Sequence, residues 1–168
     1  MIWVLLACST PAPQTQTPAE PPALVSTAAQ ELDAMDPREP VPLQPMMAWH
    51  QKQNMQEHLE AIQGITDGLA QGDWEAVKVA AALLESSPHM QLQCEHMGAG
   101  AEGFTELALD FHSRADAIGV AAEEQDTQAT LAATSHTLKA CTSCHATYKQ
   151  QVLGGAEWEQ ATGQEAPH

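Results

Sequence analysis

The sequence predicts an all-α protein, an antiparallel four-helix bundle in up-down-up-down order that follows a proline-rich tether. Alanine, the best helix former, is abundant, whereas aromatic residues make up only 4% of the 168 residues and β-branched runs are absent. Four apolar stripes with the three- and four-residue spacing of helices lie between residues 46 and 153. Short connections separate these stripes, and such connections between helices of similar length favour antiparallel neighbours.

The segments outside residues 46–153 are expected to be extended or loose. Residues 9–45 are dense in proline, which excludes packed helix or sheet over most of the segment and favours a flexible linker, with room for one short helix at residues 23–35. Residues 154–168 are acidic and contain glycine, so we expect a loose tail. The chain length fits one compact domain with such additions.

The first two helices are expected to meet at a Gln-Gly-Asp turn. The first runs from residue 46 to residue 70, with an apolar stripe formed by Met55, Leu59, Ile62, Ile65 and Leu69. The second begins at Asp73, a suitable N-cap, and resumes after Pro88 as far as Met97. Its stripe consists of Trp74, Val77, Ala81 and Leu84.

The last two helices follow a glycine-rich turn and an acidic connection. The third places on one face Phe104, Leu107, Phe111 and Ile118. Residues 123–127 then lead into the fourth helix, whose spacing resembles the a and d positions of a heptad. Its buried face is expected to comprise Leu131, Leu138, Cys141, His145, Tyr148 and Val152.

Residues 141–145 read Cys-Thr-Ser-Cys-His, which is the spacing that attaches a c-type haem. On a helix, positions i, i+3 and i+4 share one face, so Cys141, Cys144 and His145 can meet one flat ligand together. The two thiols would add to the haem vinyl groups as thioethers, and His145 would be the proximal ligand of the iron. The pattern therefore predicts one covalently bound haem c.

Three other interpretations of this motif stay open. A thioredoxin-like dithiol needs a βαβ context, which we do not find in the sequence. A zinc site needs a second ligand pair, and Cys94 and the scattered histidines do not supply one cleanly. The third interpretation is coincidence.

Charge and the N-terminus indicate partners and location. Six Lys and Arg residues against 22 Asp and Glu residues give a formal charge of −16, which argues against nucleic acid and favours either simple solubility or docking to a basic redox partner. Residues 1–8, MIWVLLAC, resemble the end of a bacterial lipoprotein signal, although they lack a basic start and are short. The resemblance implies a lipid on Cys8 as the only membrane anchor of a periplasmic protein; an untranslocated apolar tail is the alternative.

The helix order and the run CTSCHATYK near the end of the last helix resemble the cytochrome c-prime family. The resemblance covers residues 46–153, and only the terminal motif is specific. It implies one haem at one end of the bundle, with His145 as proximal ligand and the other axial position facing the first helix. Phe104 and Tyr148 are then the aromatic residues expected to pack against the haem. A homodimer stays open.

The antiparallel order assigns neighbours to the haem end. These are Met47, His50, Met55 and His58 of the first helix, and His89, Met90, Cys94, His96 and Met97 of the second-to-third connection. We choose Met55 as distal ligand, because the run NMQEHLEAIQGI is similar to the opening of Met-ligated bundle cytochromes and because a neutral thioether stabilises ferrous iron. The alternatives are His58, an open sixth position, or Met55 as a core residue.

Several other residues have expected roles that are less specific. Cys94 is expected to be a buried thiol, with a disulfide or a redox role as alternatives. Solvated or capping roles are expected for His50, His89, His96, His112 and His136, and ligation stays open for His89 and His96 because of their predicted location. Pairing with haem propionates or plain surface positions are expected for Lys52, Lys139 and Lys149.

Two functions follow from these residues. The first is a monohaem electron carrier without catalytic activity, in which Met55 completes a six-coordinate iron. The second is a haem protein that binds nitric oxide or carbon monoxide at an open or displaceable sixth position. A haem enzyme such as a peroxidase is a weaker third, because the sequence shows no distal acid-base arrangement.

Overall fold

The structure is a computed structural model in which residues 27–165 are described. The predicted signal segment at residues 1–8, with Cys8, and much of the predicted linker lie outside the described residues. The chain divides into two compact units, Met1–Asp36 and Pro37–His168. The first unit contributes helix α1 (Thr27–Met35), which falls within the range expected for a short helix.

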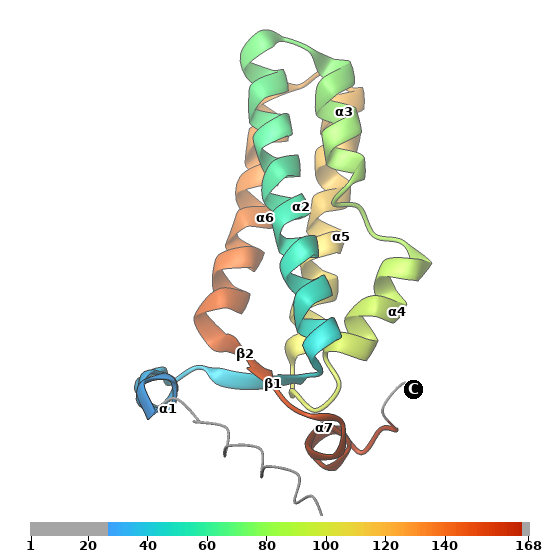
Figure 1. Cartoon of the computed structure of the whole chain (residues 1–168). Coiled ribbons are helices and arrows are strands. Elements are labelled where there is room, and N and C mark those ends of the chain that lie inside the picture. The colour runs from blue at the N-terminus through green and yellow to red at the C-terminus, as the bar shows by residue number, and fades with distance from the viewer. Residues whose placement is uncertain (1–26, 166–168) are drawn as a thin grey trace, which may run out of the picture. The chain divides into compact units, whose positions relative to one another are not determined.

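The second unit is mostly helical, as the sequence predicts. Its elements are β1 (Glu39–Leu43), α2 (Pro45–Gln71), α3 (Trp74–Ala82), α4 (Pro88–Met97), α5 (Phe104–Glu123), α6 (Thr127–Thr147), β2 (Tyr148–Val152) and α7 (Gly155–Thr162). Helix α5 packs along α6, α2 packs along α3, and α3 packs against α5 (Figure 1). No helix in the described range is long and apolar enough to cross a membrane.

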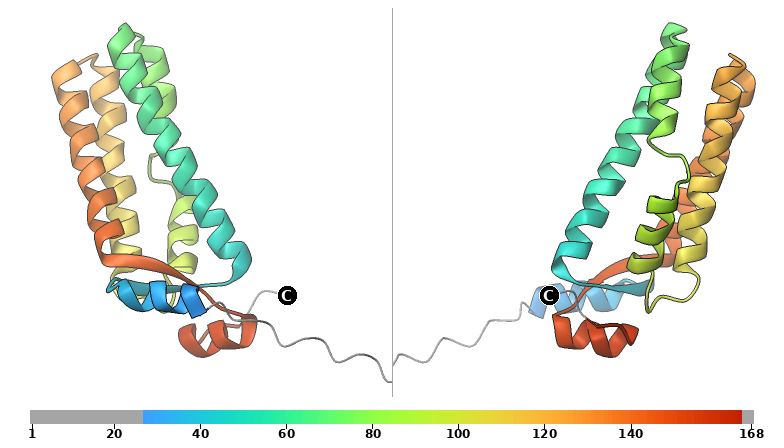
Figure 2. Two further views of the ribbon diagram at one scale, coloured as in Figure 1. Left: turned by 60° about the vertical axis from the view of Figure 1, so that its left-hand side comes forward. Right: turned by 90° about the vertical axis from the view of Figure 1, so that its right-hand side faces the viewer.

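Within this unit the helices form two pairs, and the strands lie across one end. Figure 2 shows α2 with α3 on one side and α5 with α6 on the other. The β1–β2 pair and α7 lie at the end where α2 begins and α6 finishes (Figures 1 and 2). The end of α6 is therefore next to β1, the strand that precedes α2.

Local sequence explains where several helices begin and how closely two of them approach. The side chain of Asp73 accepts a hydrogen bond from the Ala76 backbone N–H at 3.0 Å, and Asp126 caps α6 in the same way. Pro88 occupies the first turn of α4, where its missing N–H costs nothing. A Cβ at Gly68 would come within 2.7 Å of Val77, so glycine permits the contact of α2 with α3.

Two apolar clusters stabilise the unit. The central core joins α2, α3, α5 and α6 and consists of Ala61, Ile65, Val77, Ala80, Ala81, Leu84, Phe111, Ala115, Ile118, Ala122 and Ala140. The basal core, at the end that carries the strands, consists of Val41, Leu43, Met47, Ala48, Phe104 and Trp158. The apolar stripes predicted for the second and third helices agree with this burial at Val77, Ala81, Leu84, Phe104, Phe111 and Ile118.

The stripe predicted for the fourth helix is wrong except at Cys141 and Tyr148, which are half-buried; His145 and Val152 are exposed. Leu131 and Leu138 are 46% and 40% exposed, and the buried face of α6 is formed by Thr130, Thr134, Thr137 and Ala140. Each of the three threonine hydroxyls donates to the backbone carbonyl four residues earlier, at 2.7 to 3.0 Å. A threonine with its hydroxyl satisfied in this way packs like valine, so a polar face can be buried.

Three predicted boundaries at the ends of the domain also need correction. The last part of the predicted linker is strand β1, in which Val41 and Leu43 are buried. The fourth helix ends at Thr147 rather than continuing to Val152, because the chain turns into β2. The predicted loose tail contains α7, whose Trp158 is completely buried.

The two strands pair in parallel, with Glu39 opposite Tyr148 and Leu43 opposite Val152. The Leu43 carbonyl accepts from the Leu153 N–H at 2.8 Å, so the odd-numbered residues of β1 direct their backbone groups toward β2. Both prolines of β1 therefore face the other edge, where no N–H is needed. There the carbonyl of Pro42 accepts from the indole N–H of Trp158 at 3.0 Å, which fastens α7 to the strand.

Candidate functional site

The cysteine–histidine motif lies on the last two turns of α6. The helix is continuous through Thr147, so Cys141, Cys144 and His145 share one helical face, as their spacing requires. Cys141 and Cys144 continue the buried stripe of Thr130, Thr134 and Thr137 at steps of three and four residues, and both are half-buried. The His145 side chain is exposed. The motif thus presents two partly covered thiols and one accessible imidazole.

The two cysteines contact different apolar clusters. Cys141 packs against the central core, and Cys144 packs against the basal core. Burial raises the pKa of both thiols, and the proximity of Cys141 adds to the rise at Cys144. Both side chains are therefore neutral thiols at neutral pH, and they are free rather than joined in a disulfide.

The structure brings the two expected aromatic residues together beside the motif. The rings of Phe104 and Tyr148 meet edge to face with centroids 5.3 Å apart. Tyr148 packs against the basal core, as Cys144 does, and its hydroxyl donates to the Glu102 carbonyl. Phe104 begins α5 and Tyr148 follows α6, so the pair joins two neighbouring helices at the cluster that Cys144 also contacts.

Met55 lies on the inner side of α2, but its side chain is partly exposed. It shares a row of three- and four-residue steps with Gln51, His58, Ile62 and Ile65, which are buried or half-buried, and is itself 40% exposed. Leu59, which the sequence predicts on the same stripe, is 64% exposed and lies outside it. The prediction for that position is wrong because the inner row passes through His58.

A hydrogen bond ties the row that holds Met55 to the segment after the motif. The Gln150 side-chain amide donates to the Gln51 side-chain oxygen at 2.6 Å and to the Ala48 carbonyl at 3.3 Å. Met55 is one turn beyond Gln51, or about 6 Å along the helix axis. Met55 therefore lies on the same row of α2 as a residue that is bonded to the segment just after the motif.

The alternative ligand, His58, belongs to a cluster of rings inside the unit. It stacks on Phe111 with centroids 4.9 Å apart and meets His112 edge-on at 5.3 Å. Burial, together with the nearby His112, lowers the pKa of His58 to about 4. Its imidazole is therefore neutral at neutral pH and held between two other rings.

His112 has the capping role rather than the solvated role, the two that the sequence left open. It is only 3% exposed, and burial lowers its pKa. Its Nδ1 lies 2.8 Å from the Leu84 carbonyl just beyond the end of α3, so a neutral ring that carries its proton on Nδ1 caps that carbonyl. The only sequence signal was its position one residue after Phe111, at the edge of the apolar stripe.

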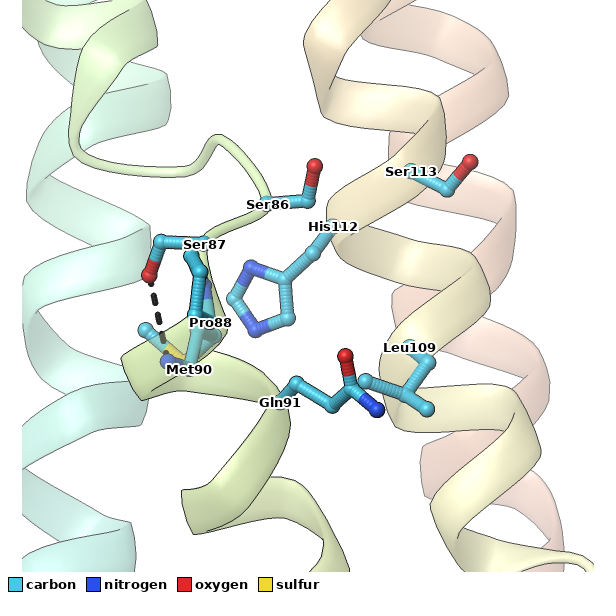
Figure 3. Close-up of a pocket in the computed structure, with 8 residues that line it drawn as sticks. All are labelled: Ser86, Ser87, Pro88, Met90, Gln91, Leu109, His112 and Ser113. Carbon is cyan, nitrogen blue, oxygen red and sulfur yellow. Dashed lines mark hydrogen bonds between the residues drawn. The ribbon is translucent and has the colours of Figure 1, made fainter.

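A cavity of about 460 Å³ opens next to His112, between the start of α4 and α5. Figure 3 shows the imidazole between Pro88 and Gln91, with Ser86, Ser87 and Ser113 around it. The Ser87 hydroxyl is used to cap Met90, and Ser86 donates to Asp116 at 2.6 Å. Ser86 therefore joins the segment before α4 to α5, whereas Ser87 stabilises the start of α4 itself.

The remaining predicted candidates lie away from the motif or at the surface. Cys94 is a buried thiol, as predicted, and burial raises its pKa. His89 and His96 of α4 are exposed, and the ring of His96 lies 6.1 Å from that of Trp158. His50, His136, Lys52 and Lys139 are exposed, whereas Lys149 is half-buried.

One functional candidate was missed entirely by sequence reasoning. Arg38, in the segment predicted to be a flexible linker, donates from Nη1 to the backbone carbonyl of His145 at 3.0 Å. The two residues are 107 positions apart in the chain, so no local pattern could have connected them.

The donor set at the motif fits a c-type haem. Such a group needs two thiols and one imidazole on one side, with apolar and aromatic contacts around them, and these are present at Cys141, Cys144, His145, Phe104 and Tyr148. Within residues 27–165, no three or more His, Cys, Asp and Glu side chains form a group able to hold a metal ion by themselves. A porphyrin supplies four nitrogen ligands of its own and requires no such group.

Comparison with protein-family models, with curated proteins and with solved structures finds no significant match to this chain.

Proposed function

We propose that the protein is a c-type monohaem cytochrome that carries electrons in the bacterial cell envelope. The proposed scaffold is an antiparallel four-helix bundle of α2, α3, α5 and α6, similar to that of the cytochrome c-prime family. The observation that carries the proposal is the spacing of Cys141, Cys144 and His145 on one continuous helix, where the two cysteines pack against the two apolar clusters. A covalently held haem would supply one-electron chemistry at its iron.

The residues of the chain have separate roles in this proposal. Cys141 and Cys144 fix the haem by two thioether bonds, and the stripe of threonines above them keeps α6 packed so that both thiols face the same way. Phe104 and Tyr148 cover the basal side with apolar surface, which lowers the local dielectric constant and excludes water from the haem edge. The exposed imidazole of His145 is free to ligate the iron.

Met55 is the proposed distal ligand, with His58 as the alternative. Support for Met55 comes from its place on the inner row of α2, one turn from Gln51, which is bonded to the segment just after the motif. Its side chain is flexible and 40% exposed, so it has room to change rotamer toward the iron. Six-coordinate iron of this kind changes oxidation state with little rearrangement, as an electron carrier requires.

The partial exposure of Met55 also favours a second candidate function. A partly exposed thioether can be displaced, so nitric oxide or carbon monoxide could compete for the sixth position. In that case the protein would bind or sense a diatomic gas rather than only carry electrons.

Location and partners form part of the same proposal. Attachment of haem c takes place in an exported compartment, and we place the protein in the periplasm with a lipid on Cys8 as its anchor. The formal charge of −16 would favour a redox partner with a basic docking surface.

One experiment tests the proposal and separates the two functions. The protein is produced with a c-type haem assembly system, and its spectra are recorded oxidised and reduced, with and without carbon monoxide. We expect haem that survives denaturation, a low-spin spectrum with a weak sulfur-to-iron band, and no change with the gas. Absence of covalent haem in wild type, with Cys141→Ala/Cys144→Ala as the matched control, would overturn the proposal.

The Met55→Ala variant assigns the sixth ligand. Loss of the sulfur-to-iron band and gain of carbon monoxide binding are expected, because Ala leaves the position open. His58→Ala is the control and should leave the band in place. A high-spin wild type that binds carbon monoxide at once would favour the gas-binding function instead.

A further inference from the structure

Arg38 makes a direct contact with the backbone of the proposed axial ligand. Its guanidinium Nη1 donates to the His145 carbonyl at 3.0 Å. That carbonyl belongs to the last turn of α6, where carbonyl groups lack a donor within the helix. Tyr148, the next residue after the helix, already uses its N–H on the Cys144 carbonyl. The arginine therefore satisfies an acceptor that the helix cannot satisfy itself.

The strand pairing determines where the backbone of Arg38 lies. It directly precedes β1, whose first residue, Glu39, pairs with Tyr148. The parallel register places the residue before β1 beside the residues before β2, which are those of the motif turn. Trp158 also donates to the Pro42 carbonyl at the other edge of β1, so the strand that follows Arg38 is held on both edges.

A cation at this place has two physical effects. The carboxyl end of a helix carries a partial negative charge, which a nearby arginine stabilises. A positive charge also stabilises the more negative of two oxidation states of a neighbouring redox group. A positive charge beside the motif is notable because the chain has only six basic residues against 22 acidic residues.

We propose that Arg38 is a positioning residue for His145, and that it raises the reduction potential of the site through this contact. The inference rests on the proposed function. The arginine holds the backbone of His145 and thereby the direction from which the imidazole approaches the iron. The β1–β2 pair is thus part of the redox site, although it lies outside the long helices.

The test compares Arg38→Gln with a matched loss of charge elsewhere. Arg114 pairs with Asp110 at 2.7 Å on the surface of α5, so Arg114→Gln removes the same charge away from the motif. On haem-loaded protein, the midpoint potential and the paramagnetically shifted proton resonances of the His145 ring are measured. We expect Arg38→Gln to favour the ferric state about tenfold, or about 59 mV for one electron, with shifted His145 resonances. Arg114→Gln should change the equilibrium less than twofold.

Arg38→Lys separates the hydrogen bond from the charge. Lysine keeps the charge but not the planar fork of donors, so the potential should be largely restored while the His145 resonances stay shifted. If Arg38→Gln yields no haem-loaded protein, this variant decides, and unchanged resonances in it overturn the proposal.

The failures of the two proposals are distinguishable. Haem-loaded Arg38→Gln that matches Arg114→Gln in both measurements overturns the role of Arg38 alone. A wild-type protein without covalent haem overturns the proposed function, and the role of Arg38 with it.

Discussion

The docking of α7 provides the sharpest test of how the motif end is stabilised. Trp158 is fully buried in the basal core and donates to the Pro42 carbonyl at 3.0 Å. Replacing it with Ala removes a large apolar side chain from a packed site, which typically costs about 3–5 kcal/mol. Trp158→Phe keeps most of the ring but leaves the buried carbonyl without its donor, at about 1–2 kcal/mol.

The assay is urea unfolding followed by far-UV circular dichroism. We expect the free energy of unfolding to fall by about 3–5 kcal/mol for Trp158→Ala, a large part of the 5–15 kcal/mol typical of a domain. The control is Trp49→Ala, the same change at a tryptophan that is 56% exposed on α2, with an expected loss below about 1 kcal/mol. Equal losses for the two alanine variants would refute the docking of α7.

Two further predictions concern the interior of the helices. The folded-state pKa of His58 is about 4, below its usual 6.5, so the unfolded chain binds more protons between these pH values. The free energy of unfolding should therefore rise by about 2–3 kcal/mol as the pH increases from 4 to 6.5. His58→Gln should flatten that rise in unfolding measurements at several pH values, and an unchanged slope would contradict the assignment. Thr134→Val should change stability by less than about 1 kcal/mol, because the hydroxyl bonds only a carbonyl of its own helix; a loss above about 2 kcal/mol would show that the hydroxyl has another partner.

The parts of the fold that depend on neighbouring residues could be predicted from the sequence. Asp73 caps α3 where expected, and the stripe of Phe104, Phe111 and Ile118 is buried as its spacing indicates. The Cys-x-x-Cys-His run is helical because its whole segment is, and both cysteines lie on the buried side. Local hydrogen bonds and periodic burial depend on residues that are close together in the chain, so one sequence is enough to predict them.

The parts that depend on distant residues could not be predicted. Trp158 is buried because Pro42 accepts its indole N–H, and those residues are 116 positions apart. The proline-rich segment reads as a linker, yet its prolines fit one edge of a strand whose other edge pairs with β2. The buried face of α6 was predicted wrongly because it consists of threonines. Their burial depends on a hydroxyl hydrogen bond that a hydrophobicity pattern does not detect.

The choice between Met55 and His58 depends on which contacts each side chain would lose on turning toward an iron. His58 is stacked on Phe111 and meets the edge of His112, and each such ring pair contributes about 0.5–1.5 kcal/mol. Turning the imidazole toward an iron would break both contacts and uncover the central core. Met55 is partly exposed on the same row of α2 and has a flexible side chain, so it can turn at a lower cost. We therefore expect Met55 to bind the iron, with the ring cluster around His58 acting as the wall that directs the thioether toward it.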